Sequence, residues 1–183
     1  LGYAKQSEKP FELGLIRNHY VGRTFIEPTQ NIRSLGVKLK LSSTKTIVKN
    51  KSIILIDDSL VRGTTCHKIV KMLYESGAKE VHVRIACPEI KFPDFYGVDM
   101  PTKNELLAHE KNNSEMCDHI NAKSLKFLSL DGLYKALIQE KRNASYPQFS
   151  DHYFTGDYPI KPYDNIQGLK IKQLSLLSGK SNN

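Results

Sequence analysis

The segment from Ser52 to Thr65 constrains the fold of this chain more than any other part of the sequence. It reads SIILIDDSLVRGTT, so four branched apolar residues (53–56) are followed at once by Asp57 and Asp58. A continuous apolar run of this length predicts a strand that is covered on both faces, as in a parallel sheet between helices. Ligands bind beyond the carboxyl ends of the strands in such sheets, so we expect a binding site at the two carboxylates.

The loop after the two aspartates is rich in small and hydroxyl residues. It runs from Ser59 to Thr65 and is followed by an apolar-periodic helix. Backbone N–H groups in such a loop, together with the positive potential of a helix start, can bind a phosphate. Ionised carboxylates only accept hydrogen bonds, so the neighbouring acids favour a ligand with hydroxyl groups. The pattern therefore predicts a ligand that carries a phosphate and a pair of hydroxyls, as a ribose 5-phosphate does.

A purely structural role for the paired acids fits the sequence less well. Helix capping would use only one of the two aspartates. A Ca²⁺ loop needs further carboxylates at alternating positions, and a Walker A loop needs a lysine before its last hydroxyl residue. Residues 59–65 contain neither feature. We therefore favour a ligand site at Asp57 and Asp58.

The central region predicts an α/β fold with a mainly parallel sheet flanked by helices. Apolar residues recur with a helical period up to Ser76, and Gly77 stands where a left-handed C-cap belongs. An alternating strand is expected over 81–86, which completes a right-handed strand–helix–strand unit. Further predicted elements are a strand over 11–16, a polar connection over 42–50, a helix over 103–111 with a capping box from Thr102 to Glu105, a short helix from Ser114 to Ile120, a last strand over 127–130 and an amphipathic helix over 130–138.

Charge and cysteine content exclude several classes of protein. A net charge of +8 suits polyanionic ligands, but the basic residues are spread along the chain and no nucleic-acid motif is present, so no nucleic-acid partner is expected. Three scattered cysteines (Cys66, Cys87 and Cys117) are too few for a disulfide framework or for four thiolate ligands. No apolar run approaches the ~18 residues of a membrane span and no signal peptide is visible, so we expect a cytoplasmic protein without a membrane partner.

The segment from Asp57 to Thr65 resembles the signature of type I phosphoribosyltransferases, which bind 5-phosphoribosyl 1-diphosphate (PRPP). It is most similar to the form found in the amidophosphoribosyltransferase (glutamine PRPP amidotransferase) family. The segments 17–26, 88–101 and 105–109 resemble the same family. On this basis we predict a phosphoribosyltransferase domain over residues 1–165, followed by a C-terminal tail over 166–183.

The resemblance implies roles for individual residues. Asp57 and Asp58 would hold the ribose hydroxyls and a Mg²⁺ ion that bridges to the diphosphate. The residues that would bind the 5-phosphate of PRPP are Ser59, Leu60, Val61, Arg62, Gly63, Thr64 and Thr65. Segment 17–26 would be a mobile loop that closes over PRPP, with Arg17, Tyr20 and Arg23 in catalysis and with Tyr20 and Ile26 lining an ammonia channel. Arg17 stands at a basic position that the family usually fills with Lys.

The family makes 5-phosphoribosylamine from PRPP and glutamine-derived ammonia, with release of pyrophosphate, in de novo purine biosynthesis. The resemblance thus implies a glycosyltransferase, purine nucleotides as feedback ligands and a homo-oligomer at full length. Two alternatives remain at this point. One is another type I phosphoribosyltransferase, such as a purine salvage enzyme, and the other is a non-enzymatic PRPP-sensing regulator.

The sequence departs from the family pattern in three ways. It has no glutaminase half with an N-terminal cysteine nucleophile, and no pyrophosphate-binding loop is present. We therefore expect a fragment that lacks its first strand or strands and is inactive with glutamine. One branch of the family also holds a [4Fe–4S] cluster through cysteines near position 94 and near the tail. This chain has Asp94, and no cysteine occurs over 147–153, so no iron–sulfur cluster is expected.

Overall fold

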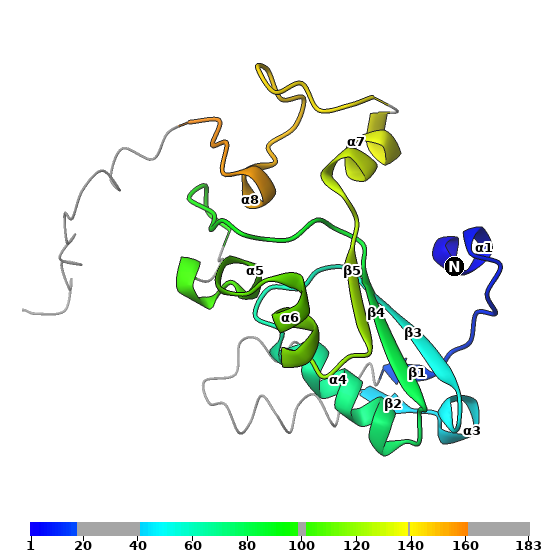
Figure 1. Cartoon of the computed structure of the whole chain (residues 1–183). Helices are drawn as coiled ribbons and strands as arrows, with labels where there is room; N and C mark the ends of the chain where they lie inside the picture. Colours follow the sequence, from blue (N-terminus) through cyan, green and yellow to red (C-terminus); the bar gives the residue numbers. More distant parts are fainter. Residues whose placement is uncertain (18–40, 99–101, 139, 161–183) are drawn as a thin grey trace, which may run out of the picture.

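A three-stranded parallel sheet forms the centre of this protein. The computed structural model describes residues 1–17, 41–98, 102–138 and 140–160. Within these ranges the parallel sheet has the strand order β3-β4-β5, and β1 and β2 form a separate antiparallel pair (Figure 1). The strands are β1 (Leu15–Arg17), β2 (Leu41–Ser43), β3 (Ser52–Asp57), β4 (Glu80–Ile85) and β5 (Ser124–Phe127). The carboxyl ends of β3, β4 and β5 lie at the upper edge of the sheet in Figure 1.

Helix α4 (Thr64–Glu75) connects β3 to β4 and gives the predicted strand–helix–strand unit. Its C-terminus follows the predicted pattern, because Gly77 adopts a left-handed backbone conformation with φ of 93°. The other helical segments are α1 (Gly2–Gln6), α3 (Lys45–Val48), the 3₁₀ helix η2 (Lys103–Glu105), α5 (Leu107–Glu110), α6 (Asn113–His119), α7 (Leu130–Ile138) and α8 (His152–Thr155). The α/β class predicted from the sequence is therefore confirmed.

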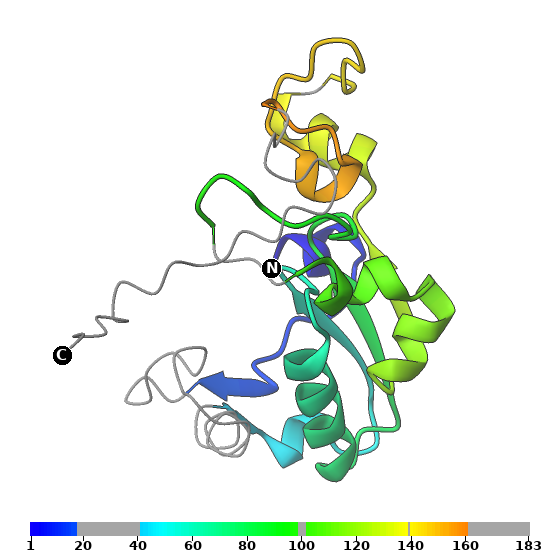
Figure 2. The ribbon, with the colours of Figure 1, turned by 90° about the vertical axis from the view of Figure 1, so that its left-hand side faces the viewer.

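The hydrophobic core lies between one face of the sheet and the helices α4 and α6. The sheet contributes Leu55, Val83 and Leu125, which are neighbours across the three strands and are all buried. Helix α4 turns its apolar stripe, including Val70 and Leu73, toward them, and Figure 2 shows this helix running along the sheet. Burial of these side chains fixes α4 on the sheet, and thereby fixes the loop that joins β3 to α4.

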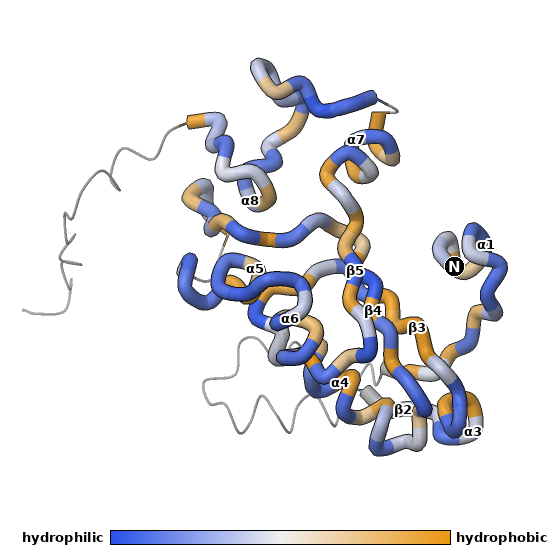
Figure 3. The backbone as a smooth tube through the Cα atoms, in the orientation of Figure 1, coloured by the Kyte–Doolittle hydropathy of each residue, from blue (hydrophilic) through white to orange (hydrophobic). Residues whose placement is uncertain are grey.

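The opposite face of the sheet is open along β3. Ile54 and Ile56 point to this face and are 36% and 46% exposed, and their neighbours on β4 are His82 and Arg84. In Figure 3, β3 is hydrophobic along its length, whereas β4 alternates between hydrophobic and hydrophilic residues. The prediction that β3 is covered on both faces is thus wrong within the described residues. A run of branched residues is equally compatible with a strand that has one covered face.

Several predicted boundaries shift for identifiable physical reasons. The helix expected over 103–111 is split into η2 and α5, because Leu106 is extended and the Leu107 N–H bonds to the Val61 carbonyl across the molecule. The expected capping box from Thr102 to Glu105 is present. Helix α6 is capped by Asn112, whose side chain accepts the Glu115 N–H at 3.0 Å, rather than by Ser114.

The short strands were the least accurately predicted. The last strand is 124–127 rather than 127–130, because Leu125 supplies the buried side chain that pairs with Val83. The first strand begins only at Leu15, and the expected polar connection over 42–50 contains the end of β2 and the helix α3. Helix α7 has the predicted bounds, 130–138.

Among the helices of the described ranges, none combines the length and the apolar composition that crossing a membrane would require.

Candidate functional site

Two adjacent carboxylates mark the carboxyl end of β3. Asp57 is the last residue of the strand and is partly buried on the same face as Leu55, whereas Asp58 follows it and is exposed. The Asp58 N–H donates to Asp57 Oδ1 at 3.0 Å, and the Ser59 hydroxyl donates to Asp58 Oδ1 at 2.9 Å. These local bonds hold both carboxylates at the start of the loop, as the sequence predicted.

The environment of Asp57 disfavours its charged form. Burial raises the pKa of Asp57; the hydrogen bond from the Asp58 N–H partly offsets this effect, and the neighbouring Asp58 charge adds to the rise. Two carboxylates this close gain from a bound cation or from hydroxyl donors. Mg²⁺ commonly binds through one or two carboxylates together with substrate phosphates, rather than in an all-protein cage. The pair Asp57 and Asp58 is of the kind that this mode uses, and the described residues contain no cluster of three or more potential metal ligands.

The loop 59–65 leads directly into the N-terminus of α4. Gly63 is the N-cap residue and has a φ of 75°, and among the described residues no side chain caps this end of the helix. The first intrahelical bond runs from the His67 N–H to the Gly63 carbonyl at 2.8 Å. The helix therefore leaves the N–H groups of Thr64 and Thr65 without intrahelical partners, and such groups bind anions well. Both threonines are exposed.

Not every loop residue presents its side chain to a ligand. Leu60 is 2% exposed and belongs to the hydrophobic core. Val61 is partly buried, and its carbonyl accepts the N–H of Leu107 at 2.9 Å. These two residues anchor the loop, so any contact with a ligand would involve Ser59 and residues 62–65 more directly.

Two thiols that sequence reasoning assigned to no role lie beside the carboxylates. Burial raises the pKa of Cys66 to about 12, and the Asp57 charge adds to this effect. Burial raises the pKa of Cys87 to about 11, with further increases from the charges of Asp58 and Asp57. Both thiols are therefore protonated at neutral pH and unsuited to act as nucleophiles. The position of Cys87 just after the end of β4 was the one available signal that it would lie near the site.

Residues from the segment 102–119 support the loop from outside. The Arg62 side chain contacts Glu105, and a hydrogen bond joins His67 Nδ1 to the His119 carbonyl at 3.0 Å. Leu107 lies against Gly63, so closely that a Cβ at this glycine would be 2.8 Å from Leu107 Cδ2. Sequence reasoning missed this support, because the partners are more than 40 residues apart and no local pattern predicts them.

Of the predicted lid residues, only Arg17 lies in the described part of the chain. Arg17 is the last residue of β1 and its backbone pairs with Leu41 of β2. Tyr20, Arg23 and Ile26 lie outside the described residues. Their expected roles in catalysis and in an ammonia channel therefore stay predictions.

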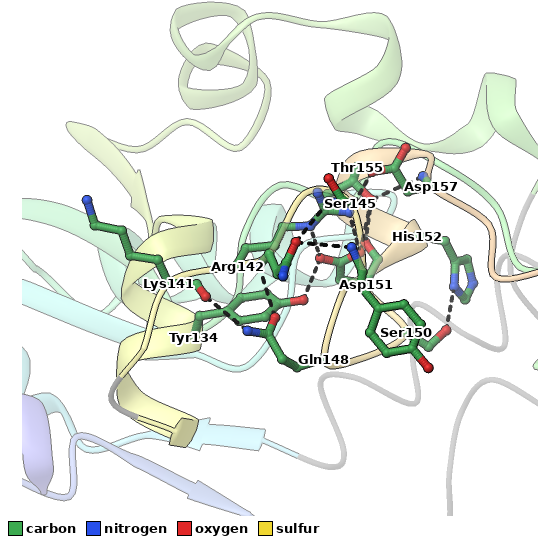
Figure 4. Close-up of polar contacts among 12 residues, drawn as sticks. Tyr134, Lys141, Arg142, Ser145, Gln148, Ser150, Asp151, His152, Thr155 and Asp157 are labelled. Atoms are coloured by element: carbon green, nitrogen blue, oxygen red, sulfur yellow. Dashed lines mark hydrogen bonds and ion pairs between the residues drawn. The ribbon is translucent and has the colours of Figure 1, made fainter.

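A second polar cluster joins α7 to the segment 142–157 (Figure 4). The carboxylate of Asp151 is 3% exposed and accepts hydrogen bonds from Tyr134 OH at 2.8 Å and from Arg142 Nε at 2.6 Å. Arg142 also pairs with Asp157. Burial would raise the pKa of Asp151, but the hydrogen bonds from Arg142, Tyr134 and Thr155 outweigh it and the pKa is lowered. The cluster is satisfied internally, which indicates a structural role.

Asp94 is a second carboxylate that accepts several hydrogen bonds, and it lies beside this cluster. It accepts hydrogen bonds from His152 Nε2 and from the Tyr153 hydroxyl, each at 2.9 Å. Side-chain hydrogen bonds thus join position 94 to the segment 147–153 in this chain. These are the two regions compared above with the cluster cysteines of one branch of the family. Cys66, Cys87 and Cys117 are all free thiols.

The parallel sheet, the paired acids at a strand end and the hydroxyl-rich loop into a helix together define the class of type I phosphoribosyltransferases. Two solved structures confirm the fold, each with a TM-score of 0.76 and each covering 90% of this chain. One is the glutamine PRPP amidotransferase of B. subtilis complexed with ADP and GMP, at 45% identity, of which 36% is covered. The other is described as the allosteric regulatory enzyme of purine biosynthesis, at 46% identity and 35% coverage.

By sequence the chain is related to the amidophosphoribosyltransferases. It is 55% identical to the amidophosphoribosyltransferase of Rhizobium etli over 97% of its own length, and 52% identical to that of Staphylococcus aureus over 89%. It covers 36% and 33% of these two proteins, so it spans about a third of the length of the relatives that it matches. A comparison with protein-family models finds no match. The resemblance inferred from the sequence is confirmed, and the salvage and sensor alternatives are not favoured.

Proposed function

We propose that this chain carries the PRPP-binding part of an amidophosphoribosyltransferase of de novo purine biosynthesis. The observation that carries the proposal is the pair Asp57 and Asp58 at the end of β3, directly before a loop that leads into a helix N-terminus without a side-chain cap among the described residues. The 55% identity to an amidophosphoribosyltransferase supports it. A diol and a phosphate at the ribose end of one substrate would match this pair and this loop respectively.

Each part of the site would bind one part of PRPP. The carboxylates of Asp57 and Asp58 would accept hydrogen bonds from the 2- and 3-hydroxyls of the ribose. Backbone N–H groups of the loop 59–65, and the hydroxyls of Thr64 and Thr65, would donate to the 5-phosphate. The positive potential at the start of α4 adds to this attraction.

The two aspartates are also the residues that would hold Mg²⁺. Burial, with a further contribution from the Asp58 charge, raises the pKa of Asp57, and a cation at this position would favour the ionised carboxylate. When bound, the ion would supply neutralisation of the negative charge on the leaving diphosphate.

The proposed reaction is attack of ammonia on C1 of the ribose. The C1–O bond to the diphosphate breaks, pyrophosphate leaves and 5-phosphoribosylamine forms. Positive charge develops on the ribose ring in the transition state, and the carboxylates of Asp57 and Asp58 would stabilise it electrostatically. We further propose that Arg17, Tyr20 and Arg23 act from a loop that closes over PRPP, and that Tyr20 and Ile26 line the path of ammonia from glutamine.

The remaining partners follow from the same relatives. The B. subtilis structure is a complex with ADP and GMP, which supports purine nucleotides as feedback ligands of the protein proposed here. We also propose a homo-oligomer at full length, which the family resemblance implies, and a cytoplasmic location, because the reaction uses soluble metabolites.

A calorimetric titration of the protein with PRPP in the presence of Mg²⁺ tests the proposal. Asp58→Asn should weaken binding at least about tenfold, because a hydrogen bond to a charged group is worth ~1.5–3 kcal/mol. Asp131→Asn removes a similar exposed carboxylate from α7 and should leave the affinity unchanged. No heat from the parent protein, or an Asp58→Asn variant that binds like the parent, would contradict the proposal. PRPP consumption that depended on a purine base would instead indicate a salvage enzyme.

A further inference from the structure

We propose that Glu105 is a positioning residue, which fixes the conformation of the loop 59–65 through its hydrogen bond and ion pair with the side chain of Arg62. On this view Arg62 contributes its backbone to phosphate binding, while its guanidinium is committed to Glu105. This inference rests on the proposed function, in which the loop 59–65 binds the 5-phosphate of PRPP.

The carboxylate of Glu105 is oriented by two separate sets of partners. Oε2 accepts hydrogen bonds from both the N–H and the hydroxyl of Thr102, each at 3.1 Å. Oε1 accepts a hydrogen bond from Arg62 Nε at 3.2 Å and forms an ion pair with Nη2 at 3.2 Å. Because the capping box with Thr102 already fixes one oxygen, the other is held in place to receive the guanidinium.

The backbone around Glu105 reinforces the same contact. Leu106 is extended, so the Leu107 N–H leaves the helical pattern and donates to the Val61 carbonyl at 2.9 Å. The Leu107 side chain packs on Gly63, where an added Cβ would be only 2.8 Å from Leu107 Cδ2. Three consecutive loop residues, 61–63, thus each meet the segment 105–107.

The value of this support would lie in orientation rather than in the strength of the ion pair. The side chains of Arg62 and Glu105 are 49% and 48% exposed, and half-exposed ion pairs contribute little on their own. A loop that is already ordered before the ligand arrives loses less conformational entropy on binding, so its affinity is higher. A guanidinium that bound the phosphate directly would instead have to leave Glu105.

A double-mutant cycle distinguishes these two roles of Arg62. With PRPP and Mg²⁺ as the titrant, Arg62→Ala and Glu105→Ala should each weaken binding about threefold, and the double variant should be no weaker than either single variant. A direct phosphate contact predicts the opposite pattern: Arg62→Ala would lose tenfold or more, while Glu105→Ala would bind more tightly because a cation is released. Glu75→Ala, which breaks the exposed Lys71–Glu75 pair on α4, is the matched control and should have no effect.

Hydrogen exchange of the Leu107 amide tests the support without any ligand. Glu105→Gln keeps the shape of the side chain and removes its charge, so it avoids a gross loss of structure. Both Glu105→Gln and Arg62→Ala should speed exchange of this amide, whereas Glu75→Ala should not. Unchanged exchange of the Leu107 amide in both Glu105→Gln and Arg62→Ala would overturn the proposal. If the parent protein failed to bind PRPP while the amide still responded, the proposed function would fail but the support of the loop by Glu105 would stand.

Discussion

Asp94 shows how one buried carboxylate can join segments that lie far apart in the sequence. Its side chain is 1% exposed and accepts hydrogen bonds from His152, from the Tyr153 hydroxyl and from the N–H groups of Tyr96 and Val98. Burial alone would raise the pKa of Asp94, but these bonds outweigh it and hold the pKa at about 2. The ionised carboxylate is therefore the form that the folded protein stabilises.

This depressed pKa makes the stability of the fold depend on pH in the acid range. Because the folded pKa of about 2 lies below the ordinary value of 3.8, Asp94 stabilises the folded state above about pH 4, and this contribution is lost as the pH falls toward 2. Asp94→Asn should lower the free energy of unfolding at pH 6, and the difference from the parent should shrink as the pH falls toward 2. Urea unfolding of both proteins at several pH values measures this. A constant difference across pH 6 to 2 would show that the effect is unrelated to ionisation.

Some contacts of individual residues can be predicted from the sequence and others cannot. Asp57 and Asp58 were identified because they directly follow an apolar strand and precede a hydroxyl-rich loop, so their signal is local. Asp94 meets His152 and Tyr153 across 58 and 59 positions. The family resemblance indicated that these two regions lie close together, but no local pattern around the three residues indicated these hydrogen bonds. Buried polar pairs of this kind come from the three-dimensional fold alone.

At the scale of elements, the turn from β3 into α4 depends on Gly63. Its φ of 75° is a conformation that costs residues with a Cβ ~1–2 kcal/mol, and the space beside it is filled by Leu107 and His119. Gly63→Ala should therefore destabilise the protein by more than this backbone cost and weaken PRPP binding. Gly97→Ala is a suitable control, because Gly97 has a φ of 106° but no atom lies within 4 Å of its added Cβ. Urea unfolding measures both variants, and equal losses would rule out the predicted clash at Gly63.

The elements predicted best were those whose pattern is set by burial on one side. Helix α4 and strand β4 follow their apolar periods, and Gly77 marks the end of the helix as expected. The errors occurred where tertiary contacts override the local pattern. The predicted helix is interrupted at Leu106, because the Leu107 N–H donates to the Val61 carbonyl instead of to a helical partner. The position of β5 is set by the pairing of Leu125 with Val83.

At the scale of the whole molecule, the described chain has two differently stabilised parts. The sheet and the helices α4 and α6 share an apolar core. Polar contacts around Asp151 instead join α7 to the segment 140–160, and Asp94 bonds to the same segment through His152 and Tyr153. Sequence patterns predicted the first part, because apolar periodicity reports burial. In the second part the period predicted helix α7, but not the contacts around it, because these depend on carboxylates and aromatic residues that follow no period.

The open face of the sheet determines how the chain should behave in solution. Among the described strands β3 pairs only with β4, and its exposed face carries Ile54 and Ile56. An unpaired, apolar edge strand promotes association between molecules, although the net charge of +8 opposes it.

Replacing both isoleucines of this face by lysine should reduce association of the isolated 183-residue chain. The added charges remove the apolar surface at the edge, so light scattering should begin at a higher protein concentration than in the parent. A variant with Leu137→Lys and Ile160→Lys adds the same charge at two other exposed apolar residues and serves as the control. If this control suppressed scattering equally, net charge rather than the β3 edge would govern association. A selective effect at β3 would identify this edge as the surface that needs a covering partner.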